Sequence, residues 1–377
     1  MQPKKIIKSL SELPTMPSTI GTMAWNQTGD WRFLTPVVAN KPAPCRRNCP
    51  AGIPIPDYLS AVNRGDVQTG LALLLAYNPL PGLTGRLCYH PCQTNCTRKK
   101  IDRAISIQEI ERFMAELGTE VKSSQNRRSD KRVTVVGSGP LGLSCAFYLG
   151  CRGLKVTVLD VNSRAGGALV GLSDKKIESQ ILEDEISRLI RIADIHLETG
   201  AVFDFNRSSS LSNPDLIILD PTALSKESGP STGSSDFNPF VDEDVRGHII
   251  AVTLPENLKA FKAPLIAHYI AAGRRTAEKV ACRLIETDSS MSVSSIGEGT
   301  KQDGVWMRER ILGEAGRCLG CGTCNLCLQC VLSCPDACIR LDDCQTGLTV
   351  DLDFCKGCGI CAHECPRGVI TMEEVGV

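Results

Sequence analysis

The distribution of cysteine constrains this chain more than any other feature of its sequence. Twenty of the 377 residues are cysteine, and most of them are separated by only two or three residues. Five lie between Cys45 and Cys96, and twelve lie between Cys318 and Cys365. Secreted proteins use many cysteines for disulfides, but the N-terminus has no continuous apolar segment typical of a signal peptide. We therefore interpret the cysteine groups as ligands of metals or iron–sulfur clusters in a cytoplasmic protein.

Two copies of one cysteine run lie near the C-terminus, each with the spacing Cys-x2-Cys-x2-Cys-x3-Cys-Pro. The first run contains Cys324, Cys327, Cys330 and Cys334, and the second contains Cys355, Cys358, Cys361 and Cys365. In paired runs of this type, three thiolates of one run bind a [4Fe–4S] cluster and the fourth ligand comes from the other run. We therefore predict that Cys365 completes the first cluster and Cys334 the second. Zinc is the alternative for Cys-x2-Cys pairs, but the repeated run with its terminal Cys-Pro disfavours it.

Four further cysteines in this region lie outside the two runs. Cys318 and Cys321 precede the first run at the same spacing of two residues. Because the Cys-Pro end fixes the register of the first run, we interpret these two as thiols outside the ligand set. Cys338 and Cys344 belong to no motif, and packed free thiols are the simpler interpretation.

The N-terminal cysteines form a looser pattern, Cys45-x3-Cys49-Pro and Cys88-x3-Cys92-x3-Cys96. By spacing alone they indicate one cluster, which gives three [4Fe–4S] clusters in the whole chain.

The segments around these cysteines resemble a known family. TGDWRFLTPVV, APCRRNCPAGIPIPDYL and NPLPGLTGRLCYHPCQTNCTRKKIDRAISIQEIERF are similar to the cluster domain of the glutamate synthase small subunit, which dihydropyrimidine dehydrogenase shares. That domain usually holds two clusters and begins with a further Cys-x2-Cys pair, and residues 30–44 contain no cysteine. The resemblance therefore implies that one cluster is absent.

The resemblance also suggests which ligands remain. Cys49, Cys88 and Cys92 match the surviving site, with Glu111 at the place of a non-cysteine fourth ligand, so that Cys45 and Cys96 would be left over. In the alternative, four of the five cysteines bind the cluster and Glu111 is a solvated helix residue.

A dinucleotide-binding fingerprint follows the helical region. An apolar strand at 132–136 leads into a turn and a helix that contain Gly137, Gly139, Pro140 and Gly142, and Asp160 ends the next strand. Such glycines let the backbone approach a pyrophosphate at the helix N-terminus, and the acidic residue accepts a hydrogen bond from a ribose hydroxyl. Gly166 and Gly167 resemble the glycine pair that flavin proteins place over the same phosphates.

In the glutamate synthase small subunit this segment binds FAD, and a second domain for NADPH is inserted after it. Here about a hundred residues separate Asp160 from a predicted helix at 263–285, with no second Gly-x-Gly-x-x-Gly. The Gly-Asp pair of the family would fall near 252–256, which reads Val-Thr-Leu-Pro-Glu. FAD binding is therefore predicted and NAD(P) binding is not expected. The alternative is a Rossmann remnant that is kept as a scaffold without a cofactor.

The predicted fold is multidomain α/β. Its parts are an extended arm at 1–44, a helical [4Fe–4S] domain at 45–122, a truncated Rossmann-like FAD domain at 131–286 and a two-cluster ferredoxin-like α+β domain at 304–377. Lysine plus arginine and aspartate plus glutamate both number 42, so no net field favours nucleic acid. No apolar run is long enough to span a membrane.

These features predict an electron-transfer subunit of a larger oxidoreductase, with clusters at both ends and a flavin between them. No catalytic residue is identified, so we expect the substrate site on a partner subunit, of 2-oxoacid, aldehyde or acyl-CoA type. Ferredoxin or a similar carrier is the expected second partner. The alternatives are a stand-alone NAD(P)H-dependent reductase and a structural iron–sulfur scaffold.

Overall fold

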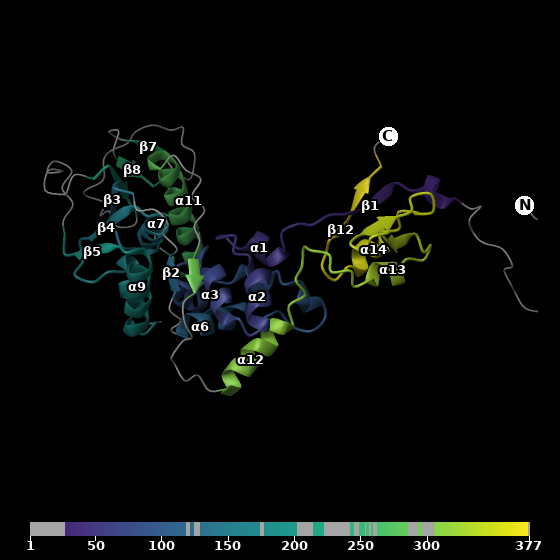
Figure 1. The fold of residues 1–377 in the computed structure, drawn as a ribbon, viewed down its shortest axis with the longest axis horizontal. Coiled ribbons are helices and arrows are strands. Elements are labelled where there is room, and N and C mark those ends of the chain that lie inside the picture. The colour runs from purple at the N-terminus through teal and green to yellow at the C-terminus, as the bar shows by residue number, and fades with distance from the viewer. Residues whose placement is uncertain are drawn as a thin grey trace, which may run out of the picture. The chain divides into compact units, whose positions relative to one another are not determined.

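The computed structural model (Figure 1) divides into two compact units. The terminal unit combines Met1–Lys41 with Thr323–Val377, and the central unit is Pro42–Gly322. The structure describes residues 27–117, 121–123, 129–173, 177–201, 214–221, 242–244, 249–252, 254–255, 258, 262–285, 293–295 and 305–375. Most of the predicted arm, at 1–26, lies outside these ranges.

The terminal unit is built from two short antiparallel strand pairs and two short helices. Strand β1 (Leu34–Val38) pairs with β12 (Ile370–Glu374), and β10 (Ile339–Leu341) pairs with β11 (Leu348–Val350). Helices α13 (Gln329–Leu332) and α14 (Ile360–Glu364) each follow a cysteine loop. Cys330, Cys338, Cys355 and Cys361 contribute to the small buried core of this unit.

The end of the predicted arm is an integral part of the terminal unit. Besides the strand pair of β1, the Thr28 hydroxyl donates a hydrogen bond to the Phe354 carbonyl at 2.6 Å, and the Gly29 N–H donates to the Asp353 carbonyl at 2.8 Å. The sequence predicted an extended segment here, but its pairing with the last strand of the chain was not predictable from local pattern.

The N-terminal half of the central unit is helical. Its helices are α1 (Pro44–Asn48), α2 (Ile55–Asn63), α3 (Val67–Leu75), α4 (Pro81–Leu87), α5 (Pro91–Thr94) and α6 (Ile107–Glu116). Several begin with proline in the first turn, where the missing N–H has no partner to lose. The Asp66 side chain caps α3 by accepting the Thr69 N–H at 3.0 Å. Apolar residues at three- and four-residue spacing, such as Tyr58, Val62, Leu71 and Ile110, are fully buried between the helices.

Helix α12 (Val305–Gly316) belongs to this helical region, although the sequence predicted that residues from 304 onward form the ferredoxin-like domain. It packs on α2 and α6, and the central unit continues to Gly322. The first two cysteines of the C-terminal group, Cys318 and Cys321, therefore lie in the central unit.

The remainder of the central unit is a doubly wound sheet in the order β5-β4-β3-β6-β8-β7. Its strands are β3 (Arg132–Val136), β4 (Lys155–Asp160), β5 (His196–Thr199), β6 (Leu216–Leu219), β7 (Asp242–Asp244) and β8 (Ile249–Ala251). All neighbours are parallel except β7, which runs antiparallel to β8. The inner strands are almost continuous apolar runs because helices cover both faces of a parallel sheet.

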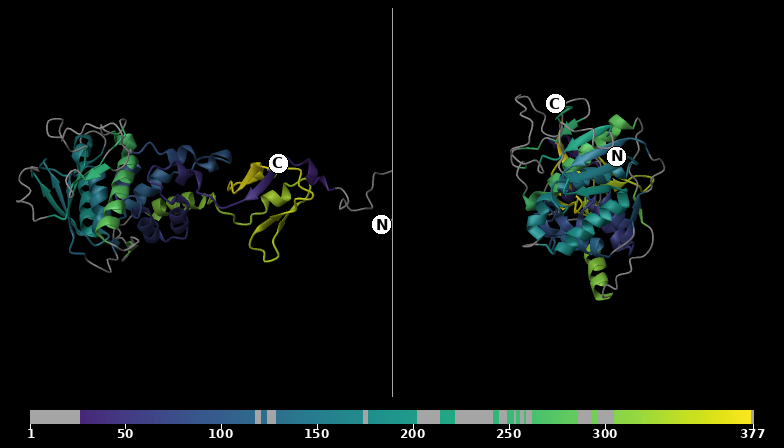
Figure 2. Two further views of the ribbon diagram at one scale, coloured as in Figure 1. Left: turned by 90° about the horizontal axis from the view of Figure 1, so that it is seen from above. Right: turned by 90° about the vertical axis from the view of Figure 1, so that its left-hand side faces the viewer.

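The helices of this region pack closely on the sheet and on one another. They are α7 (Pro140–Gly150), α8 (Val170–Ser173), α9 (Ser179–Ala193) and α11 (Ile266–Leu284). Helix α11 lies beside α7 (Figures 1 and 2). The two helices approach closely at Gly273, because a side chain there would come within 2.4 Å of the Leu141 carbonyl. A further strand pair joins β2 (Val121–Ser123) and β9 (Val293–Ser295). The predicted fold class is thus confirmed. No helix in the described ranges has the length and apolar character to cross a membrane.

Candidate iron–sulfur sites

The first run of the terminal unit surrounds a small hollow. Cys324, Cys327 and Cys330 line it together with Cys365 from the second run. The loop turns around the hollow through two left-handed residues, Leu326 (φ 57°) and Leu328 (φ 62°), which keep successive thiols on its inner side. Burial and the nearby Cys365 thiol raise the pKa of Cys330. The fold therefore brings together the four residues that the spacing predicted as one ligand set.

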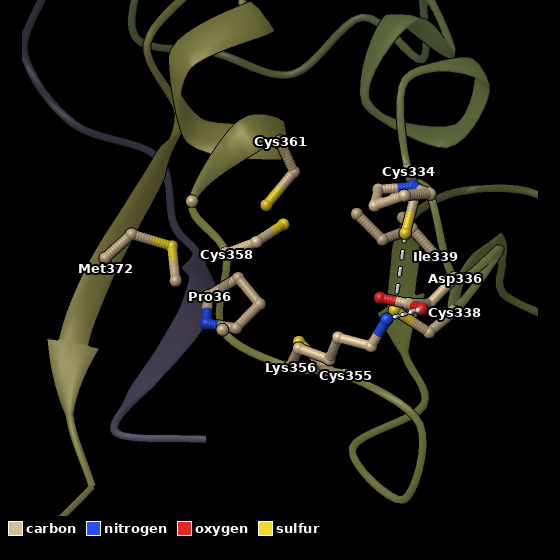
Figure 3. A pocket seen from close by; sticks show the side chains of 13 residues that line it. Pro36, Cys334, Asp336, Cys338, Ile339, Cys355, Lys356, Cys358, Cys361 and Met372 are labelled. Carbon is tan, nitrogen blue, oxygen red and sulfur yellow. Dashed lines mark hydrogen bonds and ion pairs between the residues drawn. The ribbon is translucent and has the colours of Figure 1, made fainter. Parts of the chain in front are cut away.

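The second run has the same construction (Figure 3). Cys355, Cys358 and Cys361 line a hollow with Cys334 of the first run, and Gly357 (φ 70°) and Gly359 (φ 78°) supply the left-handed turns. One turn of this loop approaches the arm closely, because a side chain at Gly357 would lie 2.2 Å from the Leu34 carbonyl.

Cys338 also lines the second hollow, which the sequence did not predict. The thiol is buried, and its sulfur lies 3.4 Å from that of Cys334, as the dashed line in Figure 3 marks. Burial and the adjacent Cys334 raise its pKa well above the ordinary value. Cys344, the other cysteine without a motif, is exposed.

A third hollow lies in the helical part of the central unit. Cys49 at the end of α1, Cys88 at the end of α4, Cys92 in α5 and Glu111 in α6 line it. Glu111 is only 4% exposed and accepts a hydrogen bond from the Tyr58 hydroxyl at 3.0 Å. The interpretation of Glu111 as a solvated helix residue is therefore wrong. Burial raises its pKa to about 7, because an unpaired carboxylate is costly away from water.

The surroundings of this hollow fit a bound cluster. His90 is buried, it adopts a left-handed conformation (φ 50°), and its backbone N–H points to the Cys88 sulfur at 3.4 Å. Its Nε2 atom is buried and has no hydrogen-bond partner in the chain. Burial lowers the pKa of this imidazole, which keeps it neutral. A neutral ring that can donate toward the hollow suits a cluster, whose potential depends on hydrogen bonds to its sulfur atoms.

Within the described ranges, no group of three or more His, Cys, Asp or Glu side chains is arranged to hold a single metal ion. A four-iron cubane binds its thiolates at the corners of a larger body than a tetrahedral zinc ion.

The glycine fingerprint forms the expected strand–turn–helix, with Gly139 as the N-cap of α7 and Pro140 at its first position. Gly142 contacts the end of β3, since a side chain there would lie 2.0 Å from the Gly137 carbonyl. Gly167 lies against Gly139, and the Gly166 N–H donates to the Ser138 hydroxyl at 2.8 Å. The turn thus has the predicted conformation.

The acidic residues around this turn do not fit a dinucleotide. Asp160 has all four of its acceptor positions occupied within the chain, by the backbone and side chains of Ser138 and Asn162. Asp220, at the end of β6, is fully buried and accepts the Gly142 N–H at 3.1 Å. Pro140 has no N–H, so the first turn of α7 has few free backbone N–H donors. The hydrogen bond to Asp220 occupies one of them. A pyrophosphate bound at this turn would lie against buried carboxylates, whereas it needs free N–H donors. The residues present therefore do not fit the pyrophosphate of FAD.

We predict that Cys365→Ser damages the cluster of the first run, because each run donates a ligand to the other. Anaerobic Cys324→Ser, Cys365→Ser and the double variant should each lose about 4 iron atoms per chain, since both residues serve one cluster. Cys365→Ser combined with Cys355→Ser should lose about 8. The exposed Cys344→Ser is the control. If the losses of iron added up in the Cys324→Ser/Cys365→Ser variant, each run would bind its own cluster with its own four cysteines.

We predict that Glu111→Gln lowers the iron content by about 4 atoms per chain, because a neutral amide is a poor ligand for iron. Glutamine keeps the shape of the side chain and can still accept from Tyr58, so the helices should fold. Glu116→Gln changes an exposed residue of the same helix and should keep all its iron. Full iron content in Glu111→Gln would show that a fourth cysteine completes this site.

We predict that protein purified anaerobically contains substoichiometric FAD. Asp220→Asn removes the buried charge but keeps an acceptor for Gly142, and should raise FAD affinity about tenfold, which corresponds to about 1.4 kcal/mol. Asp215→Asn is the control, because Asp215 pairs with Lys131 at the other end of β6. One tightly bound FAD per wild-type chain, measured after extraction, would contradict this prediction.

Three parts of the chain match family models. Residues 38–123 match dihydropyrimidine dehydrogenase domain II with a 4Fe–4S cluster, residues 135–178 match an NAD(P)-binding Rossmann-like domain, and residues 348–371 match a 4Fe–4S binding domain. Together they match a part of each of the three regions described above.

Three curated relatives resemble the chain over less than half of its length. The β subunit of the NADP(+)-dependent formate dehydrogenase of Moorella thermoacetica is 31% identical over 206 residues, which are 47% of this chain and 29% of the relative. The β subunit of the NADPH–Fe(3+) oxidoreductase of Geobacter sulfurreducens is 30% identical over 189 residues (48% and 28%). The small chain of the NADPH glutamate synthase of Bacillus subtilis is 40% identical over 146 residues (37% and 30%).

The matched regions span less than a third of each of these relatives. The dihydropyrimidine dehydrogenase-type cluster domain, the Rossmann-like domain and the ferredoxin domain nevertheless occur in the order that the sequence predicted. The chain has the domain composition of an FAD- and iron–sulfur-type oxidoreductase with a C-terminal ferredoxin domain.

Proposed function

We propose that this chain is the electron-transfer subunit of a larger oxidoreductase. It passes electrons one at a time between a catalytic partner subunit and an external carrier such as ferredoxin. The observation that carries this proposal is the presence of complete cluster-ligand sets in both units. A [4Fe–4S] cluster supplies reversible uptake of one electron.

The chain's own residues act by holding the clusters and excluding water. In the terminal unit, Cys334 and Cys365 each reach the site of the other run, so the two sites are adjacent by construction. In the central unit, Cys49, Cys88, Cys92 and Glu111 are proposed to hold a further cluster, with His90 beside it. All these groups come from short helices and tight turns, which fix their positions.

The substrate is proposed to bind to the partner. The three hollows described above are lined mainly by the predicted cluster cysteines and by apolar residues, and each also has a few polar side chains. Two of the relatives are named as β subunits of multi-subunit enzymes, which supports an accessory role. Partners of 2-oxoacid, aldehyde or acyl-CoA type remain our proposal for the catalytic subunit. None of the twenty cysteines, all of which lie in the described ranges, forms a disulfide, which agrees with the reducing cytoplasm that we propose as its location.

A stand-alone NAD(P)H-dependent reductase is the competing function, and the names of the relatives favour it. Against it, hydride transfer needs a two-electron acceptor such as a flavin next to the nicotinamide. The buried Asp160 and Asp220 carboxylates oppose dinucleotide binding at the one glycine fingerprint. A purely structural role is less consistent with several cluster sites, because one cluster is enough to brace a small domain.

We predict that the isolated protein accepts electrons from dithionite or a reduced ferredoxin but not from NADH or NADPH. Bleaching of the cluster absorbance under anaerobic conditions measures this directly. The reductase function would be supported instead by rapid, stoichiometric bleaching with either nicotinamide. Added FAD should not change the result, because free flavin is not positioned against a nicotinamide on this chain.

A further inference from the structure

Four cysteines of the two cysteine groups lie in the central unit but line none of the three hollows. They are Cys45, Cys96, Cys318 and Cys321, which the sequence left over or placed outside the ligand sets. We propose that they bind a fourth [4Fe–4S] cluster, within the central unit and separate from the two clusters of the terminal unit. This inference rests on the proposed electron-transfer function, and it adds a redox site to it.

Two of the four thiols come from packed helical turns near the start of the unit. Cys45 is the second residue of α1, and Cys96 follows α5 directly as the N-cap of a 3-10 turn at Thr97–Lys100. Helices α1 and α5 pack against each other, and both cysteines are half-buried against the main core. Neither of them lines the hollow of Glu111, so they are available for another site.

The other two thiols reach this place because an ion-pair network fixes the end of α12. Arg103 contacts both carboxylate oxygens of Glu314 at 3.1 and 2.6 Å, and the Ser106 N–H donates to Glu314 at 2.8 Å. Arg317 pairs with Glu314 at 2.7 Å and with Asp102 at 2.9 Å. Glu314 is 7% exposed, so the carboxylate end of these charge-assisted contacts is shielded from water, and the contacts hold the end of α12 in a defined register.

One contact of this network joins the two cysteine segments directly. The Arg98 guanidinium donates to the Arg317 carbonyl at 3.0 Å. Arg98 lies two residues after Cys96, and Arg317 immediately precedes Cys318. The contact joins residues more than two hundred positions apart.

The electrostatics of Cys45 show that all four thiols lie close together. Burial, with smaller contributions from Cys318, Cys321 and Cys96 as neighbouring groups, raises its pKa to about 12. Without a cation such thiols stay protonated and neutral. Iron binding would bind each sulfur as a thiolate and release its proton to solvent.

The backbone around Cys318 and Cys321 has the conformation seen at the other sites. Gly320 (φ 60°) and Gly322 (φ 91°) are left-handed, as Gly357 and Gly359 are in the second run. The Gly320 N–H points to the Cys318 sulfur at 3.4 Å. His90 and Cys88 make the same contact, from the N–H two residues on, at the Glu111 site.

The position of the proposed cluster suits electron transfer. Cys45 and Cys49 lie at the two ends of α1, four residues apart, which corresponds to a rise of about 6 Å along the helix. Cys321 is followed after two residues by Cys324, the first ligand of the terminal unit. The proposed cluster therefore shares α1 with the Glu111 site, and its last cysteine is close in sequence to the first run of the terminal unit.

Iron, sulfide and zinc analysis of anaerobically purified full-length protein tests this proposal. The wild type should contain about 16 iron atoms per chain, and the Cys318→Ser/Cys321→Ser variant about 12. The dithionite-reduced variant should lose one cluster signal in EPR and keep those of the terminal unit. Cys282→Ser, an exposed cysteine on α11, is the control and should match the wild type.

Several outcomes would overturn the proposal. Equal iron content in the wild type and the double variant would do so, as would one zinc atom per chain that disappears in the variant. Cys45→Ser provides an independent variant in case the double variant does not fold, as judged by far-UV circular dichroism, and should lose the same signal. Failure of the electron-transfer proposal is distinguishable, because it would leave the iron content at 16 while dithionite or ferredoxin reduced no cluster.

Discussion

Buried sulfur ligands must be collected from distant parts of a chain, and this requirement organises both units. Thiolates repel one another and are poorly solvated in the interior, so a set of four is stable only when a cation compensates for them. Each set here joins at least two segments that are far apart in the sequence. Cys334 and Cys365 exchange between the two C-terminal runs, while Cys49, Cys88 and Glu111 come from three different helices. The surrounding helices are short, and several of them end at a predicted ligand.

Buried carboxylates hold these segments in place through hydrogen bonds and ion pairs. Glu314 binds two arginines and a backbone N–H, and thereby holds the end of α12 against the loop after Cys96. Glu111 accepts a hydrogen bond from the Tyr58 hydroxyl, and burial raises its pKa to about 7, which agrees with our proposal that it is a cluster ligand. Asp220 lies against the N-terminus of α7, a place that doubly wound folds otherwise offer to phosphate. Three buried acids of similar chemistry thus have three different roles, set by what surrounds them.

Taken together, these sites support our proposal that the chain moves single electrons and that substrate chemistry belongs to a partner. The proposed clusters of the central unit lie one turn of α1 apart, and the loop from Cys321 to Cys324 leads into the terminal unit. The Rossmann-like sheet provides a large buried core beside the helical region, to which Glu185 of α9 connects by accepting the Gly82 N–H at 2.9 Å. In this view the sheet supports the cluster sites, and two-electron chemistry belongs to a partner.

The sequence by itself determined the features that depend on local spacing. The paired Cys-Pro runs predicted their own ligand exchange, the glycine fingerprint predicted β3, its turn and α7, and the helical pattern predicted the N-terminal cluster domain. Tertiary structure decided what depends on the meeting of distant segments. The burial of Glu111, the carboxylate of Asp220 at the glycine turn and the approach of Cys318 and Cys321 to Cys45 have no local signature. The Cys-x2-Cys pair of the resembling family is absent from residues 30–44, before Cys45. The fold instead brings the pair Cys318 and Cys321 toward Cys45 from the other end of the central unit. The spacing of cysteines along a chain identifies only ligands that are close in sequence. A cluster requires only that its ligands are close in space, so ligands from distant segments have no such signal.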